Sequence, residues 1–160
     1  MPTIETIIHA YGPALARVAT SYEADRALRE DLLQEMLFAI HRALPSLRED
    51  ASLAPFVFRI AHNRGVTHAL RQRAARLGAL QMEPPAEPTT PEESRIESER
   101  THRLQAAIRR LPVPYRQVIT LVLEEMSYQD IATTLGIGIS NVGVRVSRAK
   151  AQLKEFLRDE

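Results

Sequence analysis

Residues 127–150 read SYQDIATTLGIGISNVGVRVSRAK, and this stretch decides the fold of the C-terminal half of the chain. Ser127 is followed three residues later by Asp130, a capping-box pattern that predicts a helix beginning near Tyr128. Gly136 readily adopts the left-handed backbone conformation that ends a helix. The stretch therefore predicts one short helix that stops at a glycine turn.

A second helix should follow, capped by Ser140 and running to about Leu157. At about 100° per residue its apolar positions form a single stripe, made of Val142, Val146, Ala149 and Leu153. No acid occurs between Ile131 and Lys154. Two helices around a glycine turn, with the small Ala132 where they cross, are typical of a DNA-reading helix-turn-helix.

The opposite face of this second helix carries small polar groups and cations, which suit base edges and phosphates in a major groove. The candidate DNA-contacting residues are Ser140, Asn141, Val144, Arg145, Ser147, Arg148 and Lys150. An ordinary amphipathic helix with a solvated basic face is the alternative interpretation.

The composition favours helices and excludes several kinds of chemistry. The 160 residues, 44% of them hydrophobic, form one large domain or two small ones, and with no tryptophan the core must come mainly from Leu, Ile, Val and Ala. The absence of cysteine excludes disulfides, thiolate catalysis and cysteine-bound zinc. With no signal-like N-terminus and no run of 18 apolar residues, we expect a cytoplasmic protein that does not insert into a membrane.

A proline-rich stretch divides the chain. Residues 82–94, MEPPAEPTTPEES, hold four prolines among acids and threonines, which predicts an extended linker. We expect an all-α fold of two small helical domains, at 1–77 and 99–160, joined by a Pro/Glu-rich flexible linker at 78–98.

The N-terminal domain should contain three helices. An apolar stripe from Ile7 to Tyr22 predicts the first, bent or broken at Gly12-Pro13, and a second stripe predicts a helix ended by Pro45. Pro55 suits the first turn of the third helix. The expected inner face of this third helix consists of Phe56, Ile60, Ala61, Val66 and Leu70.

The formal net charge of +1 conceals a strong pattern. Residues 51–82 contain five arginines and no acid, whereas residues 83–99 contain six glutamates and one arginine. Two basic surfaces separated by an acidic segment suggest a polyanion contacted at two places. Ordinary solvated helix faces are the plainer explanation of the same charges.

With both halves interpreted, the chain closely resembles the extracytoplasmic-function class of bacterial sigma factors, the specificity subunits of RNA polymerase. Residues 107–156 resemble the fourth region of that family, which reads the −35 promoter element. DLLQEMLFAIHRAL, residues 31–44, resembles its polymerase-binding helix. PFVFRIAHNRGVTHALRQR, residues 55–73, resembles its −10-reading and strand-melting helix.

The resemblance implies roles for individual residues. Asp31, Gln34 and Glu35 would dock on a coiled coil of the largest polymerase subunit. The residues that would face the −10 element are Phe56, Arg59, Asn63, Arg64 and Arg71. The seven candidate residues of the helix-turn-helix would read the −35 element.

The chain also departs from the family pattern. Phe56 stands where tryptophan is usual, Thr67 where aspartate is usual, and Glu125 where glycine is common. Asn141-Val142-Gly143 replaces a frequent lysine or threonine-lysine pair, so the exact −35 sequence is left open.

The expected function is promoter-specific transcription initiation with core RNA polymerase and promoter DNA as partners. An anti-sigma factor is a further expected partner, and the free chain should be a monomer. The alternative is an autonomous helix-turn-helix regulator that binds DNA as a dimer. No enzyme activity, metal or cofactor is expected, because the chain lacks HExxH, GxSxG and a glycine-rich phosphate loop.

Overall fold

The computed structural model describes residues 1–79 and 95–158. Within these ranges every regular element is a helix. The chain divides into two compact units, Met1–Ala86 and Glu87–Glu160, each with its own internal packing. The expected all-α fold is confirmed for the part of the chain that the structure describes.

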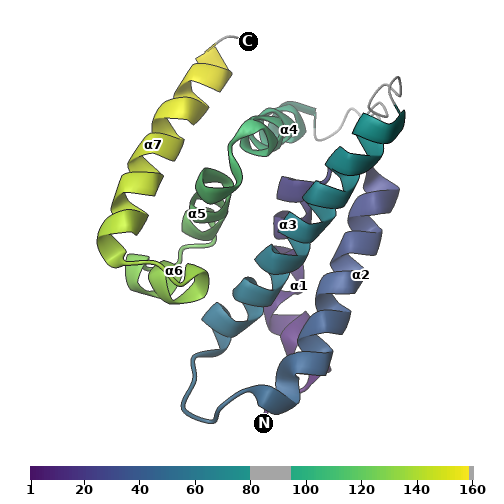
Figure 1. Cartoon of the computed structure of the whole chain (residues 1–160), viewed down its shortest axis with the longest axis vertical. Coiled ribbons are helices and arrows are strands. Elements are labelled where there is room, and N and C mark those ends of the chain that lie inside the picture. The colour runs from purple at the N-terminus through teal and green to yellow at the C-terminus, as the bar shows by residue number, and fades with distance from the viewer. Residues whose placement is uncertain (80–94, 159–160) are drawn as a thin grey trace. The chain divides into compact units, whose positions relative to one another are not determined.

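The first unit is a bundle of three helices that pack against one another, α1 (Ile4–Tyr22), α2 (Arg26–Ala43) and α3 (Leu53–Ala79) (Figure 1). A short 3₁₀ turn, η1 (Leu44–Ser46), follows α2. Each of the three helices contributes branched or aromatic side chains to one core. Its large buried side chains include those of Ile7, Leu15, Val18, Leu32, Met36, Ile40, Val57 and Phe58.

Local sequence explains where these helices begin. The Thr3 side chain accepts a hydrogen bond from Thr6 N at 3.3 Å, and Thr6 Oγ1 accepts one from Thr3 N, so α1 starts with a reciprocal capping box. Asp25 caps α2 by accepting a hydrogen bond from Leu28 N at 3.0 Å. Pro55 lies in the first turn of α3, as the sequence predicts.

Of the bend or break expected at Gly12-Pro13, the break does not occur. Helix α1 continues through Pro13 to Tyr22. Proline removes the hydrogen bond to the carbonyl four residues earlier, that of His9. Both Pro13 and His9 are exposed, so water can solvate the freed carbonyl and the helix tolerates the loss.

The predicted inner face of α3 is partly wrong. Ala61 is buried as expected, but Leu70 is 61% exposed. The residues that face the core are Val57, Phe58, Ala61 and His62, one position away from much of the expected stripe. Beyond residue 72, all the described side chains of α3 are exposed, because α1 and α2 no longer cover the helix.

Polar side chains join the end of α1 to α3 in the core. Tyr22 Oη lies 2.7 Å from Nδ1 of His62, and Glu23 Oε1 lies 2.8 Å from Nε2 of His68. Burial lowers the pKa of His62 to about 3, so this imidazole is neutral at physiological pH. These pairs satisfy groups that would otherwise be buried without partners.

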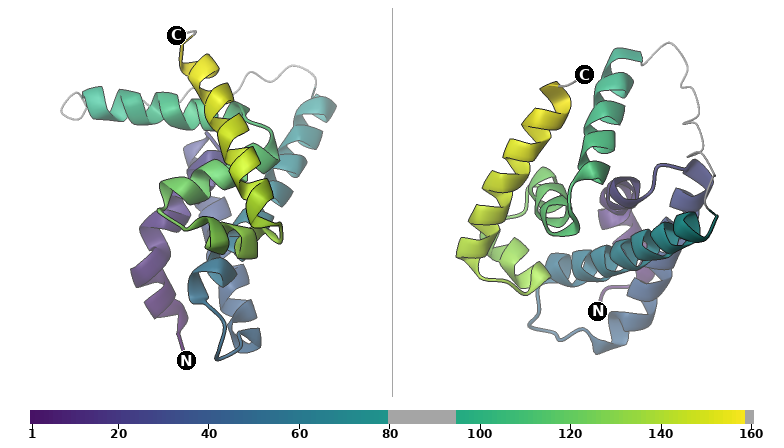
Figure 2. Two further views of the ribbon diagram at one scale, coloured as in Figure 1. Left: turned by 90° about the vertical axis from the view of Figure 1, so that its left-hand side faces the viewer. Right: turned by 45° about the horizontal axis from the view of Figure 1, so that its top comes forward.

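The second unit contains α4 (Arg95–Arg110), α5 (Val113–Leu123), α6 (Tyr128–Leu135) and α7 (Ile139–Arg158). Helix α7 packs against the other three, and Figure 2 shows α6 at its N-terminal end. Helix α4 ends before Pro112, and α5 begins at Val113, between Pro112 and Pro114. The core of the second unit includes Ile108, Leu111, Val118, Leu121, Ile131, Val142 and Val146.

Most of the predicted linker, residues 78–98, lies outside the described residues. Of its ends, residues 78–79 belong to α3 and residues 95–98 to α4. The domain boundaries therefore stay a prediction.

Candidate nucleic-acid interface

The turn between α6 and α7 has the geometry that the sequence predicts. Ser127 Oγ accepts a hydrogen bond from Asp130 N at 3.1 Å and caps α6. Gly136 adopts φ 68° and ψ 37°, and its N–H donates to the Ala132 carbonyl. The chain is thereby turned sharply from α6 into α7.

Helix α7 begins two residues earlier than a cap at Ser140 predicts. It starts at Ile139, so Ser140 lies in the first turn instead of capping the helix. Val142 N donates to the Gly138 carbonyl at 3.1 Å, which places the helix start at the second glycine of the turn. The predicted capping role of Ser140 is wrong, but its side chain is exposed at the N-terminal end of α7.

The two faces of α7 are as different as predicted. Val142, Val146, Ala149 and Leu153 are all buried. Six of the seven candidate DNA-contacting residues are exposed, namely Ser140, Asn141, Val144, Ser147, Arg148 and Lys150. Arg145 is half-buried on the flank. The structure thus places the candidate set on one accessible side of a single helix.

The rest of the unit holds this helix firmly. One terminal nitrogen of Arg116 donates to the carbonyl oxygens of Arg109 at 2.8 Å and Leu111 at 3.0 Å, which fixes the turn from α4 to α5. The Arg110 guanidinium lies over the Phe156 ring, 4.1 Å from its centroid, and ties α4 to the C-terminal part of α7. These contacts hold α7 in a fixed position, so its exposed face can meet a partner with a defined geometry.

The turn from α5 to α6 contains a strained residue. Glu125 adopts φ 63°, a conformation that glycine takes without a steric penalty and other residues take at a cost of about 1 to 2 kcal/mol. Its N–H donates to the Val122 carbonyl at 2.9 Å. With glutamate in place of glycine at position 125, the turn between α5 and α6 is still formed, but its backbone is locally strained.

Helix α3 presents a second cationic surface. Arg59, Asn63, Arg64 and Arg71 are exposed, whereas Phe56 is half-buried. Phe58 belongs to the core, where its ring meets that of Tyr11 edge to face with the centroids 5.8 Å apart. Since α3 contains no acid, all the formal charge on its exposed surface is positive, from Arg59 to Arg76.

Helix α2 presents a surface of the opposite sign. Asp31, Gln34 and Glu35 are exposed, while Leu32, Met36 and Ile40 are buried on the other side. The acids and the amide therefore form one accessible edge, as the sequence predicts. Such charged surfaces mainly set the orientation and rate of association with a partner.

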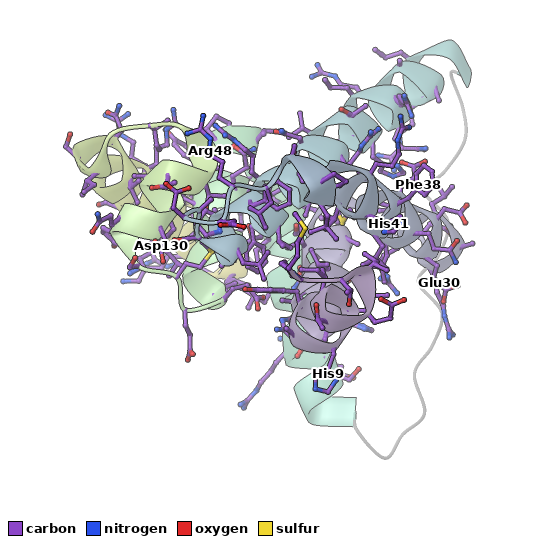
Figure 3. The ribbon with its side chains drawn as sticks, turned by 90° about the horizontal axis from the view of Figure 1, so that it is seen from below. His9, Glu30, Phe38, His41, Arg48 and Asp130 are labelled. Atoms are coloured by element: carbon purple, nitrogen blue, oxygen red, sulfur yellow. The ribbon has the colours of Figure 1, made fainter. Side chains whose placement is uncertain are left out.

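The sequence interpretation missed Phe38, which is 62% exposed on α2. Figure 3 shows Phe38 and His41 pointing outward from this helix. Phe38 follows Glu35 by three residues, Gln34 by four and Asp31 by seven, so helical spacing alone would have placed it on the same edge. The Arg42 guanidinium lies 5.8 Å from its ring centroid.

Two kinds of feature are absent from the described residues. No group of three or more His, Asp or Glu side chains there is arranged to hold a metal ion. None of the helices described is long and apolar enough to cross a membrane.

Family models match both halves of the chain. Residues 7–75 match the model described as Sigma-70 region 2, and residues 101–153 match the model described as Sigma-70, region 4. The first match covers α1, α2 and most of α3, and the second covers the helix-turn-helix.

Curated relatives match over most of the chain. The ECF RNA polymerase sigma factor SigM of Mycobacterium tuberculosis is 32% identical, with 89% of this chain and 69% of the relative covered. The RNA polymerase sigma factor NccH of Alcaligenes xylosoxydans is 30% identical, with 95% and 85% covered. The ECF RNA polymerase sigma factor SigE of Mycolicibacterium smegmatis is 27% identical over 98% of this chain, which spans only 62% of that relative.

Solved structures of similar fold cover nearly the whole chain. The sigma factor RpoE of Bartonella quintana, solved in complex with the anti-sigma factor NepR, has a TM-score of 0.78 at 22% identity, with 96% of each chain covered. CnrH, solved in complex with the cytosolic domain of CnrY, has a TM-score of 0.72 at 25% identity, with 98% of this chain and 88% of that chain covered.

Proposed function

Because the chain belongs to the ECF sigma factors of RNA polymerase, we propose that it directs core polymerase to promoters by contacting two DNA elements. The first unit binds polymerase and the −10 element, and the second reads the −35 element. The observation that carries this proposal is the two-faced helix α7, whose apolar stripe is buried and whose polar and cationic face is exposed behind a glycine turn.

The −35 contact is assigned to the exposed face of α7. The side chains proposed to contact DNA are Ser140, Asn141, Val144, Arg145, Ser147, Arg148 and Lys150. The uncharged members, which are Ser140, Asn141, Val144 and Ser147, can reach base edges in the major groove, whereas the cations can also reach phosphates. The firm packing of α7 in its unit supports this assignment, because sequence reading requires a fixed helix.

The −10 contact is assigned to α3. Arg59, Arg64 and Arg71 supply positive charge for the DNA backbone, and Asn63 supplies a hydrogen-bonding group. Phe56 is half-buried, so part of its ring remains accessible to a displaced base. Flipping a base out of the duplex costs a few kcal/mol, which contacts from both polymerase and this unit must offset.

The polymerase contact is assigned to the exposed edge of α2, with Asp31, Gln34 and Glu35 docking on a basic surface of the largest subunit. Like other specificity subunits, the chain acts by binding and carries out no reaction of its own. Its place of action is the cytoplasm, where polymerase meets the chromosome. An anti-sigma factor is a further proposed partner, in keeping with the complex in which RpoE of Bartonella quintana was solved, that with the anti-sigma factor NepR.

Binding measured with and without core polymerase tests this proposal. A promoter duplex should be retained weakly by the chain alone and in a sequence-specific complex once core polymerase is added. Tight specific binding by the chain alone, at palindromic half-sites, would instead identify an autonomous dimeric regulator.

A further inference from the structure

One aliphatic side chain stands in the middle of the polar face of α7. Val144 is 46% exposed. Leu153, nine residues later, lies about two and a half turns along the helix and is therefore on the opposite side, where it is buried. Val144 is thus directed away from the core of its unit.

Hydrogen-bonding groups frame this side chain. Ser140 and Arg148 lie one turn before and after Val144, and Asn141 and Ser147 lie three residues to either side. All four are exposed. The reading face is therefore an apolar centre of two methyl groups with polar groups around it.

Nothing within the described unit explains this choice of residues. An exposed valine is a weaker helix former than alanine, arginine or lysine, because its branched side chain is restricted against the preceding turn. The preceding Gly143 lowers helix stability by a further ~1 kcal/mol relative to alanine. A Cβ placed at this position would meet no atom within 4 Å, so packing does not require a glycine here. Residues that weaken an element without improving its packing point to a contact outside the unit.

The chemistry of the major groove identifies that contact. Hydrogen-bond donors and acceptors line the groove, and the 5-methyl group of thymine is its one apolar group. We propose that Val144 is a specificity-determining residue that packs against a thymine methyl in the −35 element, with Gly143 letting the backbone beside it approach the DNA. This inference rests on the proposed function and adds a base preference to it.

Deoxyuridine differs from thymidine only by that methyl group, so it tests the contact directly. Promoter fragments would be selected with the holoenzyme of the full chain and core polymerase from a pool randomised across the −35 region. Each thymine of the selected element would then be replaced in turn by deoxyuridine, and the dissociation constant would be measured at fixed salt. For the wild-type chain we expect one replacement to weaken binding roughly fourfold, as removal of one buried methyl does.

Variants of α7 assign the effect to one side chain. In Val144→Ala the same deoxyuridine replacement should have little further effect, since the side chain that packed on the methyl is gone. Alanine favours helix, so this variant should fold, which circular dichroism would verify. Leu157→Ala removes a similar exposed side chain from the far end of the same helix, and it should keep the full wild-type response.

Each outcome is decisive. A deoxyuridine effect of equal size in the wild-type chain and in Val144→Ala would overturn the inference, because another group would be reading the methyl. So would a selected element in which no thymine responds, although the proposed function would then stand. If the wild-type holoenzyme selects no −35 sequence at all, the proposed function itself fails and the inference fails with it.

Discussion

At the scale of single residues, Gly65 sets how closely α3 approaches the end of α1. A Cβ at this position would lie 2.5 Å from Cε2 and 2.7 Å from Cγ of Tyr22, whose buried ring cannot retreat without losing its contact with His62. The sequence alone gives no sign of this role, because the two residues are far apart in the chain. The reason for the glycine is steric and lies in the tertiary structure.

Replacement of Gly65 by alanine should therefore destabilise the first unit. We expect a loss of about 1 to 3 kcal/mol in the free energy of unfolding, the usual effect of overpacking a core. Gly78→Ala on the same helix is the matched control, since a Cβ there meets no atom within 4 Å. Urea denaturation followed by circular dichroism would measure both variants, and equal stability of the two would contradict the steric argument.

The buried His62 makes the stability of this unit depend on pH. Burial lowers its pKa from 6.5 to about 3 in the folded state. Above pH 6.5 the imidazole is neutral in both folded and unfolded chains and contributes no pH dependence. Between pH 6.5 and about 3 the unfolded chain takes up a proton that the folded chain does not. As the pH is lowered through this range, the free energy of unfolding should therefore fall by up to about 1.4 kcal/mol per pH unit.

Denaturation curves across this pH range would measure the slope. His62→Gln should flatten the slope in this window, whereas replacement of the exposed His9 by glutamine should leave it unchanged. An unchanged slope in His62→Gln would mean that other groups account for the loss of stability in acid.

At the scale of elements, the helix-turn-helix could be predicted well because its signals are local. The Ser127 cap, the left-handed Gly136 and the stripe from Val142 to Leu153 each depend on neighbours within a few residues, and all are confirmed. The predicted start of α7 is two residues late, because Ser140 is a residue type that favours the cap position, whereas Gly138 occupies it. Backbone geometry at a glycine leaves no side-chain signal in the sequence.

The burial of other residues depends on which helices pack against each face, and the periodicity of apolar residues in the sequence could not predict it. Leu70 lies nine residues after the buried Ala61 and therefore on the opposite side of α3, away from the core, so it is exposed. The helix is not broken at Pro13, because the solvent-facing position of this residue allows α1 to continue. The exposure of Phe38 and the buried pair of Glu23 and His68 likewise follow from tertiary packing.

The edge of α2 yields a prediction about partner binding. Asp31→Lys combined with Glu35→Lys should abolish association with core polymerase, because it replaces two acids on the proposed docking edge by cations. Glu5→Lys combined with Glu49→Lys makes the same change in net charge at exposed positions outside α2, and it should leave association intact. Co-purification with core polymerase measures the effect, with circular dichroism to verify the helix content of each variant.

If both pairs of substitutions weaken association equally, net charge alone drives the encounter. If neither pair does, the α2 edge is not the docking site.

The exposed face of α7 yields a second prediction. Arg148 lies one turn beyond Val144, near the centre of the reading face, so we expect it to contact a base. Arg148→Ala should then weaken −35-dependent promoter binding by about 1 to 3 kcal/mol and relax the preference at one base pair. Lys154→Ala, a change of equal charge further along the same helix, should affect binding much less.

Salt titration of holoenzyme binding separates the two possible contacts of Arg148. If Arg148 contacts a base, Arg148→Ala should leave the slope of log affinity against log salt concentration nearly unchanged. If it contacts a phosphate, the same substitution should make that slope shallower by about one counterion. A uniform loss across promoter sequences with a shallower slope would contradict the base-reading role.

At the scale of the whole molecule, the charge pattern and the division into units fit contact with one polyanion at two places. The cations of α3 belong to the first unit and those of α7 to the second, and the proline-rich segment lies between them in sequence. The sequence alone predicted this division, because proline and glutamate cannot build a packed core. The roles of the individual site residues could not be fixed in the same way, since they depend on partners.

If the chain directs polymerase to promoters, the positions at which transcription starts depend on its presence. Run-off transcription from genomic fragments, with core polymerase in the presence and absence of the chain and with start sites mapped, tests this most directly. The account predicts a new set of start sites that appears only with the chain and shares two sequence elements upstream at a constant spacing. Transcripts that begin at the same positions with and without the chain would contradict it.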